Sequence, residues 1–294
     1  MKIRILLLTM LPVICLAQVN SNGEKPAGEL LSKEISPNEM KRNASFNVEE
    51  IKVRWKKAAL ENCTGVPCVA APSFTCGTST ISDIDENVYE TVSIGTQCWT
   101  KTNLKVTKYN NGDEIPDSTN STWGTATIGA RTGHLGTDYN INPVPNYIGT
   151  YGYLYNWYAV TDSRKMCPAG WHVPSFSEWK ILAKYIDPVA DTTQNCELGC
   201  TIINTVAGSL KSTALWSTSG ASIDIWGFSA LPAANRRDNS HPNAEIGILS
   251  NFWTTNETIY PGAAIYTQLS TLNGDLVANI GNLPFNLSVR CLKD

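Results

Sequence analysis

One segment in the middle of the chain carries the clearest helical pattern of apolar residues. Trp179, Leu182, Ala183 and Ile186 recur there at helical spacing. Residues at this spacing share one face of a helix, so we expect that face to be buried. The helix should end at residues 187–188, Asp-Pro, because proline lacks a backbone donor and disfavours a helical conformation in the residue before it.

The start of this helix is also written in the sequence. Ser175 and Glu178 have the spacing of a capping box, in which each side chain binds a free backbone N–H of the first turn. Pro174 and Trp179 stand where a hydrophobic staple would form. Together with Trp171, these residues form the structural motif that we expect to organise the fold around the middle of the chain.

Short strand-like runs dominate the sequence from about residue 75 onward. Residues 88–94 alternate loosely and are rich in β-branched side chains, and Gly95-Thr96 predicts a turn after them. Further strands are expected over residues 104–109, 226–231, 251–255, 263–269 and 288–292. Short helices are expected within 151–160 and 207–214, and a long loop over 117–147. Many strands and few helices without a βαβ rhythm predict an α+β fold.

The first residues are typical of a secretory signal peptide, predicted over residues 1–17. Lys2 and Arg4 give a basic start, and residues 5–16 are mostly apolar. The run ends in Cys-Leu-Ala, which approximates a small-x-small cleavage site, so Gln18 would become the mature N-terminus.

Two other interpretations of this start were weighed. Attachment of lipid to Cys15 would make a lipoprotein, but Ile14 is bulky where that signal has a small residue. A membrane-spanning helix needs a longer apolar run than this one. No other long apolar segment follows, so we expect no transmembrane segment.

The sequence predicts a flexible arm over residues 18–75, before the folded domain at 76–294. Residues 18–46 are polar, with glycine, proline, serine and asparagine scattered through them. One amphipathic helix is expected near 47–62, packing on its own domain or on a partner. Its apolar face would consist of Val48, Ile51, Trp55, Ala58 and Ala59.

Composition narrows the classes of partner. The chain has 42% hydrophobic and 17% charged residues, a formal net charge of -3 and a pI of about 5.7. Without a basic surface there is little to attract a phosphate backbone, so nucleic acid is excluded as the expected partner. Low charge combined with many Gly, Ser, Thr, Asn and aromatic residues is typical of an extracellular β-rich protein.

Several separated motifs, in a fixed order, resemble those of the Fibrobacter succinogenes major paralogous domain family. The central ones are YGYLYNWYAV and CPAGWHVPSFSEW; the others are VYETVSIGTQCWTKTNLKVTKYNNGDEIP, GFSALPAANR, FWTTNE and SVRCLKD. The resemblance covers roughly residues 76–294. It implies secretion or surface exposure in Bacteroidetes-like bacteria and a fold related to the C-type-lectin-like and formylglycine-enzyme-like group.

What the resemblance implies for the fold is an α+β, C-type-lectin-like domain with short antiparallel strands, few helices, long loops and disulfides. It implies no established activity. One departure concerns the glycines of the family's ALPGGxR pattern, which are Ala233 and Ala234 here. A tight backbone turn at that point is therefore in question.

The cysteine count favours disulfides. Removal of Cys15 with the signal peptide leaves eight of the nine cysteines, and an even number in an exported chain favours pairing. The spacing leaves the pairing open, and CxxC zinc spacing is absent. Cys63–Cys68 and Cys196–Cys200 are close enough to form local loops, Cys76–Cys98 would brace a first hairpin, and Cys167–Cys291 is the pair that we predict. The last rests on two motifs that occur together in the family, and it would tie the centre of the chain to its last strand.

The sequence offers little catalytic chemistry. Phosphate-binding, dinucleotide-binding, HExxH and GxSxG motifs are all missing. His172 could act as a base only with an oriented partner, which the sequence does not reveal, so a packed, hydrogen-bonded histidine is the expectation. Asp83, Asp85 and Asn87 could begin a calcium loop, but residues 88 and 94 do not fit its later positions, which favours an ordinary turn.

A lectin-like calcium site is a weaker alternative. Asn243, Asn256 and Glu257 lie near a proline and in a WTTNE run, which is comparable in position to the calcium ligands of C-type lectins. They would supply only part of the oxygen shell that calcium needs. We therefore expect no cofactor, with calcium as the one ion considered.

The sequence analysis favours a non-catalytic, exported recognition or assembly protein at the bacterial cell surface. Its partner would be a surface glycan or a protein, and its location the periplasm, the outer surface or the medium. Carbohydrate binding and a structural scaffold role are the two close alternatives. A relative of the formylglycine-generating oxidases is the third, and it would need a free cysteine pair.

Overall fold

The computed structural model describes residues 73–117, 126–133, 147–193, 200–202, 206–217, 222–236, 245–272 and 274–294. All of them except residues 73–74 belong to one compact unit, Thr75–Asp294. The predicted signal peptide at 1–17, the helix near 47–62 and nearly all of the predicted arm lie outside the described residues.

The first sheet has five strands and joins both ends of the unit. Its strands are β1 (Thr80–Ser82), β2 (Val88–Ile94), β3 (Gln97–Thr100), β6 (Trp171–His172) and β11 (Leu292–Lys293). The order is β1-β2-β3-β11-β6, and every pairing is antiparallel. Gly95 takes a left-handed φ of 61° in the two-residue turn between β2 and β3, as the sequence predicted for this hairpin. The last strand thus lies between β3 and the central motif.

The second sheet has four strands in the order β7-β10-β9-β8. Its strands are β7 (Cys200–Ile202), β8 (Leu249–Glu257), β9 (Ala263–Ser270) and β10 (Leu276–Asn282); a small third sheet pairs β4 (Arg131–Thr132) with β5 (Leu154–Tyr155). The helices are α3 (Tyr147–Tyr151), α4 (Trp157–Val160), α5 (Phe176–Ile186) and α6 (Val206–Leu210). Short antiparallel strands with few helices confirm the α+β prediction.

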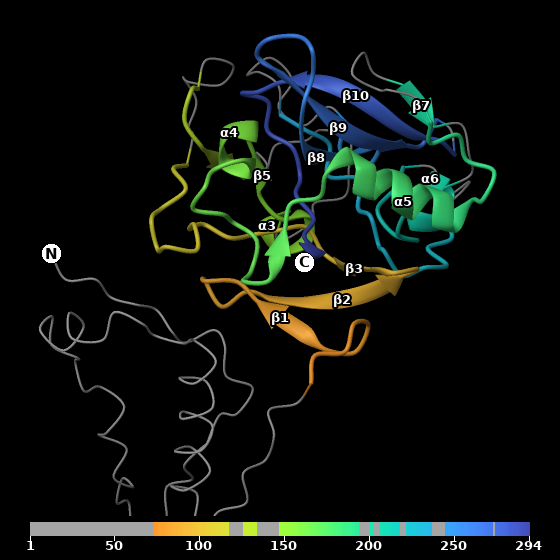
Figure 1. The fold of residues 1–294 in the computed structure, drawn as a ribbon, viewed down its shortest axis with the longest axis horizontal. Helices are drawn as coiled ribbons and strands as arrows, with labels where there is room; N and C mark the ends of the chain where they lie inside the picture. The colour runs from red at the N-terminus through yellow and green to blue at the C-terminus, as the bar shows by residue number, and fades with distance from the viewer. Residues whose placement is uncertain are drawn as a thin grey trace, which may run out of the picture. The chain divides into compact units, whose positions relative to one another are not determined.

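Helix α5 fills the space where the two large sheets meet. Figure 1 shows β8, β9 and β10 on one side of it and β2 and β3 on the other. Trp179 on α5 is fully buried, with ring centroids 4.9 Å from Trp99 on β3 and 5.5 Å from Phe252 on β8. The apolar face predicted from the helical spacing is therefore the contact that joins the sheets.

Three predicted strands are irregular in the structure, and of residues 288–292 only Leu292 belongs to a strand. Residues 226–231 make only an isolated bridge at Ala230, because Gly227 and Ser229 both have left-handed φ angles, 69° and 56°. A strand requires extended backbone at every position. Residues 104–109 alternate inward and outward, but they too make only an isolated bridge, at Lys108.

Candidate functional site

The predicted capping box is present at the start of α5. The backbone N–H of Glu178 donates to Ser175 Oγ at 3.3 Å, and the N–H of Ser175 donates to Glu178 Oε2 at 2.7 Å. Asn256 adds a contact that the sequence did not predict, since its Oδ1 accepts the N–H of Phe176 at 2.7 Å. The first turn of α5 is thus anchored both within the motif and to the end of β8.

This contact bears on the calcium alternative. Asn256 Oδ1 is directed at the start of α5, and Glu257 lies beyond an irregularity in the β8–β9 pairing with an exposed side chain. Asn243 lies outside the described residues. Within the described ranges, no three His, Cys, Asp or Glu side chains are grouped so that they could hold a metal ion. We draw no calcium chemistry from these positions.

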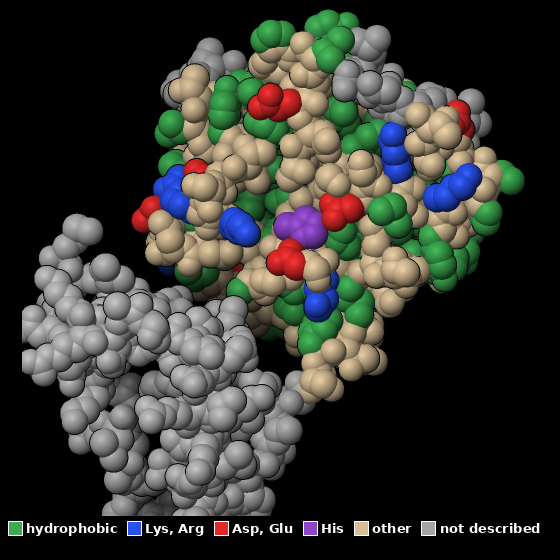
Figure 2. Space-filling view, in the orientation of Figure 1, with side chains coloured by type: hydrophobic (Ala, Val, Ile, Leu, Met, Phe, Trp, Pro, Cys, Tyr) green, Lys and Arg blue, Asp and Glu red, His purple; other side chains and the backbone are tan. Residues whose placement is uncertain are grey.

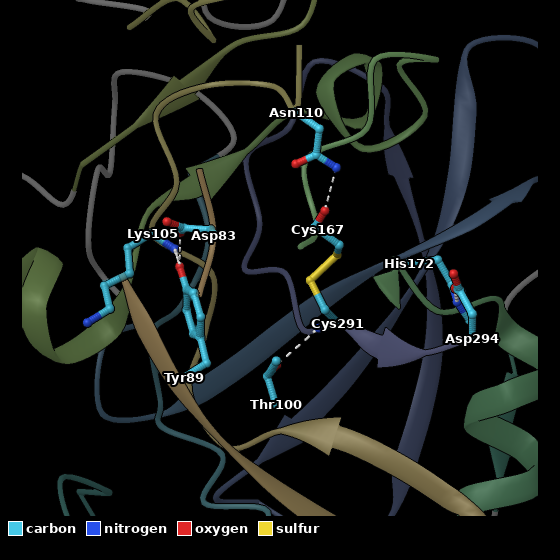
Figure 3. The surroundings of a disulfide bond; sticks show 9 residues. All are labelled: Asp83, Tyr89, Thr100, Lys105, Asn110, Cys167, His172, Cys291 and Asp294. Atoms are coloured by element: carbon cyan, nitrogen blue, oxygen red, sulfur yellow. Dashed lines mark hydrogen bonds and ion pairs between the residues drawn. A yellow bond between two sulfur atoms is a disulfide. The ribbon is translucent and has the colours of Figure 1, made fainter. Parts of the chain in front are cut away.

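His172 lies between two carboxylates at the surface. Its Nδ1 is 2.6 Å from Asp294 Oδ1 and its Nε2 is 2.9 Å from Glu178 Oε1. Figure 2 shows the histidine with an acidic side chain on either side, and Figure 3 shows it facing Asp294. Both ring nitrogens are therefore engaged, which suits an imidazolium that donates twice.

The pKa values of His172 and Glu178 shift in opposite directions. Partial burial works against the charged imidazole, but the hydrogen bonds and charges of Asp294 and Glu178 outweigh it and raise the pKa of His172. Burial likewise opposes the charged form of Glu178, but its bonds to Ser175 and His172 lower the pKa of that carboxyl. A histidine whose two ring nitrogens both contact carboxylates has no free nitrogen to take a proton from a substrate. The trio acts as a structural clamp around the capping box.

Two disulfides brace the described part of the chain. Cys76–Cys98 ties the segment before β1 to β3, and Cys167–Cys291 ties the central motif to the residue before β11. Both are among the pairs expected from the sequence. Cys200 is also disulfide-bonded. The other predicted disulfide cysteines, Cys63, Cys68 and Cys196, lie outside the described residues.

The Cys167–Cys291 bridge lies in the interior. Both cysteines are almost completely buried, and the side-chain amide of Asn110 donates to the carbonyl of Cys167 at 2.7 Å. The N–H of Cys291 donates to Thr100 Oγ1 at 3.1 Å. These contacts are visible in Figure 3. A bridged, buried pair offers no thiolate for the oxidase chemistry considered from the sequence.

Arg290 explains why three of the sequence motifs meet. Its side chain is buried and donates to Asn103 Oδ1 and to the carbonyls of Thr100, Phe228 and Ser229 at 2.7–3.1 Å. Burial lowers the pKa of Arg290 to about 9, against the opposing charge of Asp224, and leaves it charged at neutral pH. The motifs SVRCLKD, GFSALPAANR and QCWTKTN are thus joined by one guanidinium, and their role is structural.

The alanines that replace the family's glycines keep a tight turn. Ala234 has a left-handed φ of 58°, and its N–H donates to the carbonyl of Leu249 at 2.8 Å. Ala233 has no such angle. The turn that the sequence left in question is therefore present, and Ala234 carries the strain that a glycine would avoid.

An open hollow of about 540 Å³ is the strongest candidate for a binding site in the described structure. It is lined by Asp85, Asn87, Lys105, Thr107, Ile148, Gly149 and Tyr153. Three separate segments supply this lining: the turn before β2, the stretch after β3, and α3 with the residues that follow it. Most of these side chains are polar, and Tyr153 contributes an aromatic ring.

The Asp-x-Asp-x-Asn sequence forms one wall of the hollow as an ordinary turn. Asp83 Oδ1 accepts the backbone N–H groups of Asp85 and Asn87, both at 3.0 Å, and Asp83 Oδ2 accepts the hydroxyl of Tyr89 at 2.5 Å. Asp85 Oδ2 accepts the N–H and the hydroxyl of Thr107 at 2.5 and 2.8 Å. These carboxylates are used to shape the wall, as the turn interpretation expected.

Three groups in the hollow make no hydrogen bond within the described part of the chain. They are Asn87 Oδ1, Lys105 Nζ and the hydroxyl of Tyr153. Sequence analysis missed Lys105, Thr107 and Tyr153. The available signal was the alternation of buried Leu104 and Val106 with outward-facing residues, which the search for catalytic motifs did not use.

Comparison with known proteins assigns the family. A search of curated proteins and a search of solved structures each found no match to this chain. A family match to the Fibrobacter succinogenes major domain spans residues 92–293, more than half of the chain, and contains the central motif, the disulfide Cys167–Cys291 and Arg290. On that match, the chain belongs to the Fibrobacter succinogenes major domain family.

Proposed function

We propose that this protein is a non-catalytic, exported recognition protein that binds a saccharide in the hollow beside Tyr153. The observation that carries the proposal is the set of unpaired polar groups there, Asn87 Oδ1, Lys105 Nζ and the Tyr153 hydroxyl. A ligand rich in hydroxyl groups can donate to the amide oxygen and accept from the ammonium and the phenol. The hydrogen-bond donors and acceptors of the hollow therefore match the hydroxyl groups of a saccharide.

The aromatic ring supports the same ligand class. Tyr153 is partly exposed, and its ring lies 4.6 Å from the Arg131 guanidinium and 6.4 Å from the Tyr155 ring, so it is held in place. A fixed ring offers flat apolar area with a polar end, which suits the mixed surface of a sugar. The hydrogen-bond donors and acceptors around it would set the orientation.

Export and the broader fold group are part of the proposal. The disulfides are typical of a chain that matures in an oxidising compartment, and the family points to a surface or secreted protein. No helix in the described ranges combines the length and apolar character needed to cross a membrane. We also propose kinship with the C-type-lectin-like group, which the sequence motifs imply.

A scaffold role is the second candidate because apolar side chains are exposed near α5. Ile181 and Tyr185 are each about half exposed on the helix, and Tyr185 packs edge-on against Trp226 at 5.4 Å. Ile225, next to Trp226, is 65% exposed. Exposed apolar groups that gather in this way are typical of protein–protein contacts.

A glycan array with the full chain, followed by calorimetry, tests the saccharide proposal. Tyr153→Ala should abolish binding to the sugars that the native protein binds on the array. Tyr153→Phe should weaken this binding, because it removes the hydroxyl that hydrogen-bonds the sugar. Tyr158→Ala, which changes a partly exposed tyrosine on α4 outside the hollow lining, is the matched control. Melting curves verify that each variant folds. Sugar binding that survives Tyr153→Ala in a folded variant would place the site elsewhere, and absence of any glycan binding would favour the scaffold role.

A further inference from the structure

The charged side chains around the hollow differ in whether they have a partner of opposite charge. Asp85 Oδ1 lies 3.5 Å from Lys108 Nζ, and Lys108 also lies 3.8 Å from Glu114. Burial alone would raise the pKa of Asp85, but the hydrogen bonds from Thr107 and the charge of Lys108 lower it, so Asp85 stays ionised at neutral pH. The negative charge in this wall therefore has a cation of its own.

Asp83 is compensated differently, through hydrogen bonds. It is buried and accepts from two backbone N–H groups, from the Asn87 amide and from the Tyr89 hydroxyl. Both carboxylate oxygens of Asp83 thus accept hydrogen bonds within the wall. This carboxylate is a fixed part of the wall rather than a partner for a mobile cation.

Lys105 is the lysine in the lining of the hollow whose ammonium does not pair with either of these carboxylates. It makes no ion pair in the described structure, and its contact is a cation–π approach of 6.0 Å to the Tyr89 ring. Figure 3 shows its side chain extending away from the Asp83–Tyr89 pair. Its backbone N–H donates to the Tyr89 hydroxyl at 3.0 Å, so the base of the side chain is fixed while the ammonium is not. A lysine with an anchored base and an unpaired ammonium can receive an anion in the hollow.

We infer that the ligand of the hollow is an acidic saccharide whose carboxylate pairs with Lys105. This inference rests on the proposed saccharide function and adds the charge of the ligand. Tyr153 would contact the sugar ring, and Asn87 Oδ1 would accept a hydrogen bond from a sugar hydroxyl. A single ammonium is a compact point charge that suits one carboxylate, whereas recognition of a phosphate or sulfate group typically uses the forked donors of arginine or several cations.

The test compares matched acidic and neutral sugars on the full-length protein. Galacturonate, glucuronate and mannuronate oligomers differ from their carboxyl-reduced counterparts at one position of each unit, where a charged carboxylate is replaced by a neutral hydroxymethyl group. We expect the native protein to bind at least one acidic oligomer about twofold to fivefold more tightly than its reduced form at low salt, the size expected of one partly exposed charge pair. The preference should fall as sodium chloride is raised to about 0.5 M, because salt screens exposed charges.

Variants assign the preference to Lys105. Lys105→Met should remove the difference between acidic and reduced oligomers and should weaken binding of the reduced form only by the loss of one hydrogen bond. Lys105→Arg should keep most of the difference. Lys101→Met is the control, since Lys101 is paired with Glu90 at 2.9 Å and lies outside the hollow lining. A change in preference in the Lys101 variant equal to that of Lys105→Met would overturn the assignment.

The outcomes separate this inference from the proposed function. Equal binding of acidic and reduced oligomers, unaffected by Lys105→Met, overturns the inference and leaves saccharide binding intact. Binding of neither form overturns the proposed function together with the inference. A hexaglutamate peptide serves as the non-sugar anion, and binding of this peptide as tight as that of the best uronate would overturn the saccharide class.

Discussion

The guanidinium carbon of Arg290 lies 4.6 Å from the ring centroid of Phe228, and Arg290 Nη1 also donates to that residue's carbonyl at 2.9 Å. Through this double contact, a residue beside the last strand holds both the ring and the backbone of a loop more than sixty positions earlier. The same guanidinium binds the carbonyl of Thr100 at the end of β3. One side chain thus links three segments in the interior.

Replacement of Arg290 by methionine should destabilise the domain strongly. The change keeps apolar volume but removes every donor, and each orphaned buried carbonyl costs about 1–3 kcal/mol, so a loss of about 3 kcal/mol or more is expected. Chemical denaturation measures it. Lys101→Met, on a partly exposed side chain, should change the free energy of unfolding by less than about 0.5 kcal/mol. A similar small effect for Arg290→Met would show that the guanidinium is not what joins these segments.

The start of α5 should depend on two side chains. Ser175→Ala is expected to lower the free energy of unfolding by about 0.5–2 kcal/mol, the usual cost of a lost cap. Asn256→Ala should cost a similar amount, about 1 kcal/mol, because Phe176 N–H loses its acceptor. Thermal and urea unfolding of both variants provide the values. Unchanged stability in the double variant would contradict the capping geometry.

The His172 clamp should weaken as pH rises. The folded pKa of His172 is raised, so its contribution is fully present below the unfolded value near 6.5 and is lost as pH rises through the folded value. The folded pKa of Glu178 is lowered, so its contribution is present above the unfolded value of 4.5 and is lost as pH falls through the folded value. The clamp is therefore complete between about pH 4.5 and 6.5.

Nuclear magnetic resonance titration of the His172 ring protons checks the direction of its pKa shift. His172→Gln should remove the decline in stability that begins as pH rises above about 6.5, with an effect below about 1 kcal/mol because the ring is partly exposed and screened by solvent. A His172 pKa below 6.5 would contradict the two-carboxylate arrangement.

Ala234→Gly should stabilise the protein. A left-handed alanine costs about 1–2 kcal/mol, which exceeds the roughly 0.8 kcal/mol from burying its methyl group, so a net gain of about 0.5–1 kcal/mol is expected. The neighbouring Ala233→Gly is the matched control, and it should destabilise by about 0.5–1 kcal/mol because its backbone has no such strain. Equal effects of the two substitutions would refute the strained turn.

The two disulfides should differ in their response to reductant. Cys167 and Cys291 are at most 1% exposed, whereas Cys76 is partly exposed, so mild reductant should open Cys76–Cys98 first. Loss of Cys167–Cys291 by substitution of both cysteines should cost about 4–5 kcal/mol from loop-closure entropy, reduced by any structure in the unfolded chain. Non-reducing peptide mapping identifies each bridge, and a Cys98–Cys291 peptide would contradict both pairings.

Local signals account for what the sequence predicted well. The capping box and helical spacing placed α5, and the Gly95 turn placed the β2–β3 hairpin, because each depends on residues within a few positions of one another. The family motifs added the pairing of Cys167 with Cys291. The helix boundaries followed from Ser175 and Asp187, which are the caps in the structure.

The candidate site could not be predicted because it has no local signature. Its lining comes from three segments whose polar side chains are ordinary when read one at a time, and they become a site only when Lys105 and Tyr153 face the same hollow.

The wrong strand prediction at residues 226–231 has a different cause. An apolar run suggested a strand, but the left-handed backbone at Ser229 turns the carbonyls of this loop toward Arg290. The sequence also did not indicate that Arg290, the charged residue of the SVRCLKD motif, would be buried.

The place of β11 between β3 and β6 has a consequence for the order of events during synthesis. Before β11 (residues 292–293) is in place, β3 pairs only with β2, and β6 has no partner in this sheet. β11 then pairs with both β3 and β6. The five-stranded sheet can therefore be completed only after nearly the whole domain has been made. For a protein that we propose is exported, we expect completion of this sheet and formation of the Cys167–Cys291 bridge to follow passage of nearly the whole domain across the membrane.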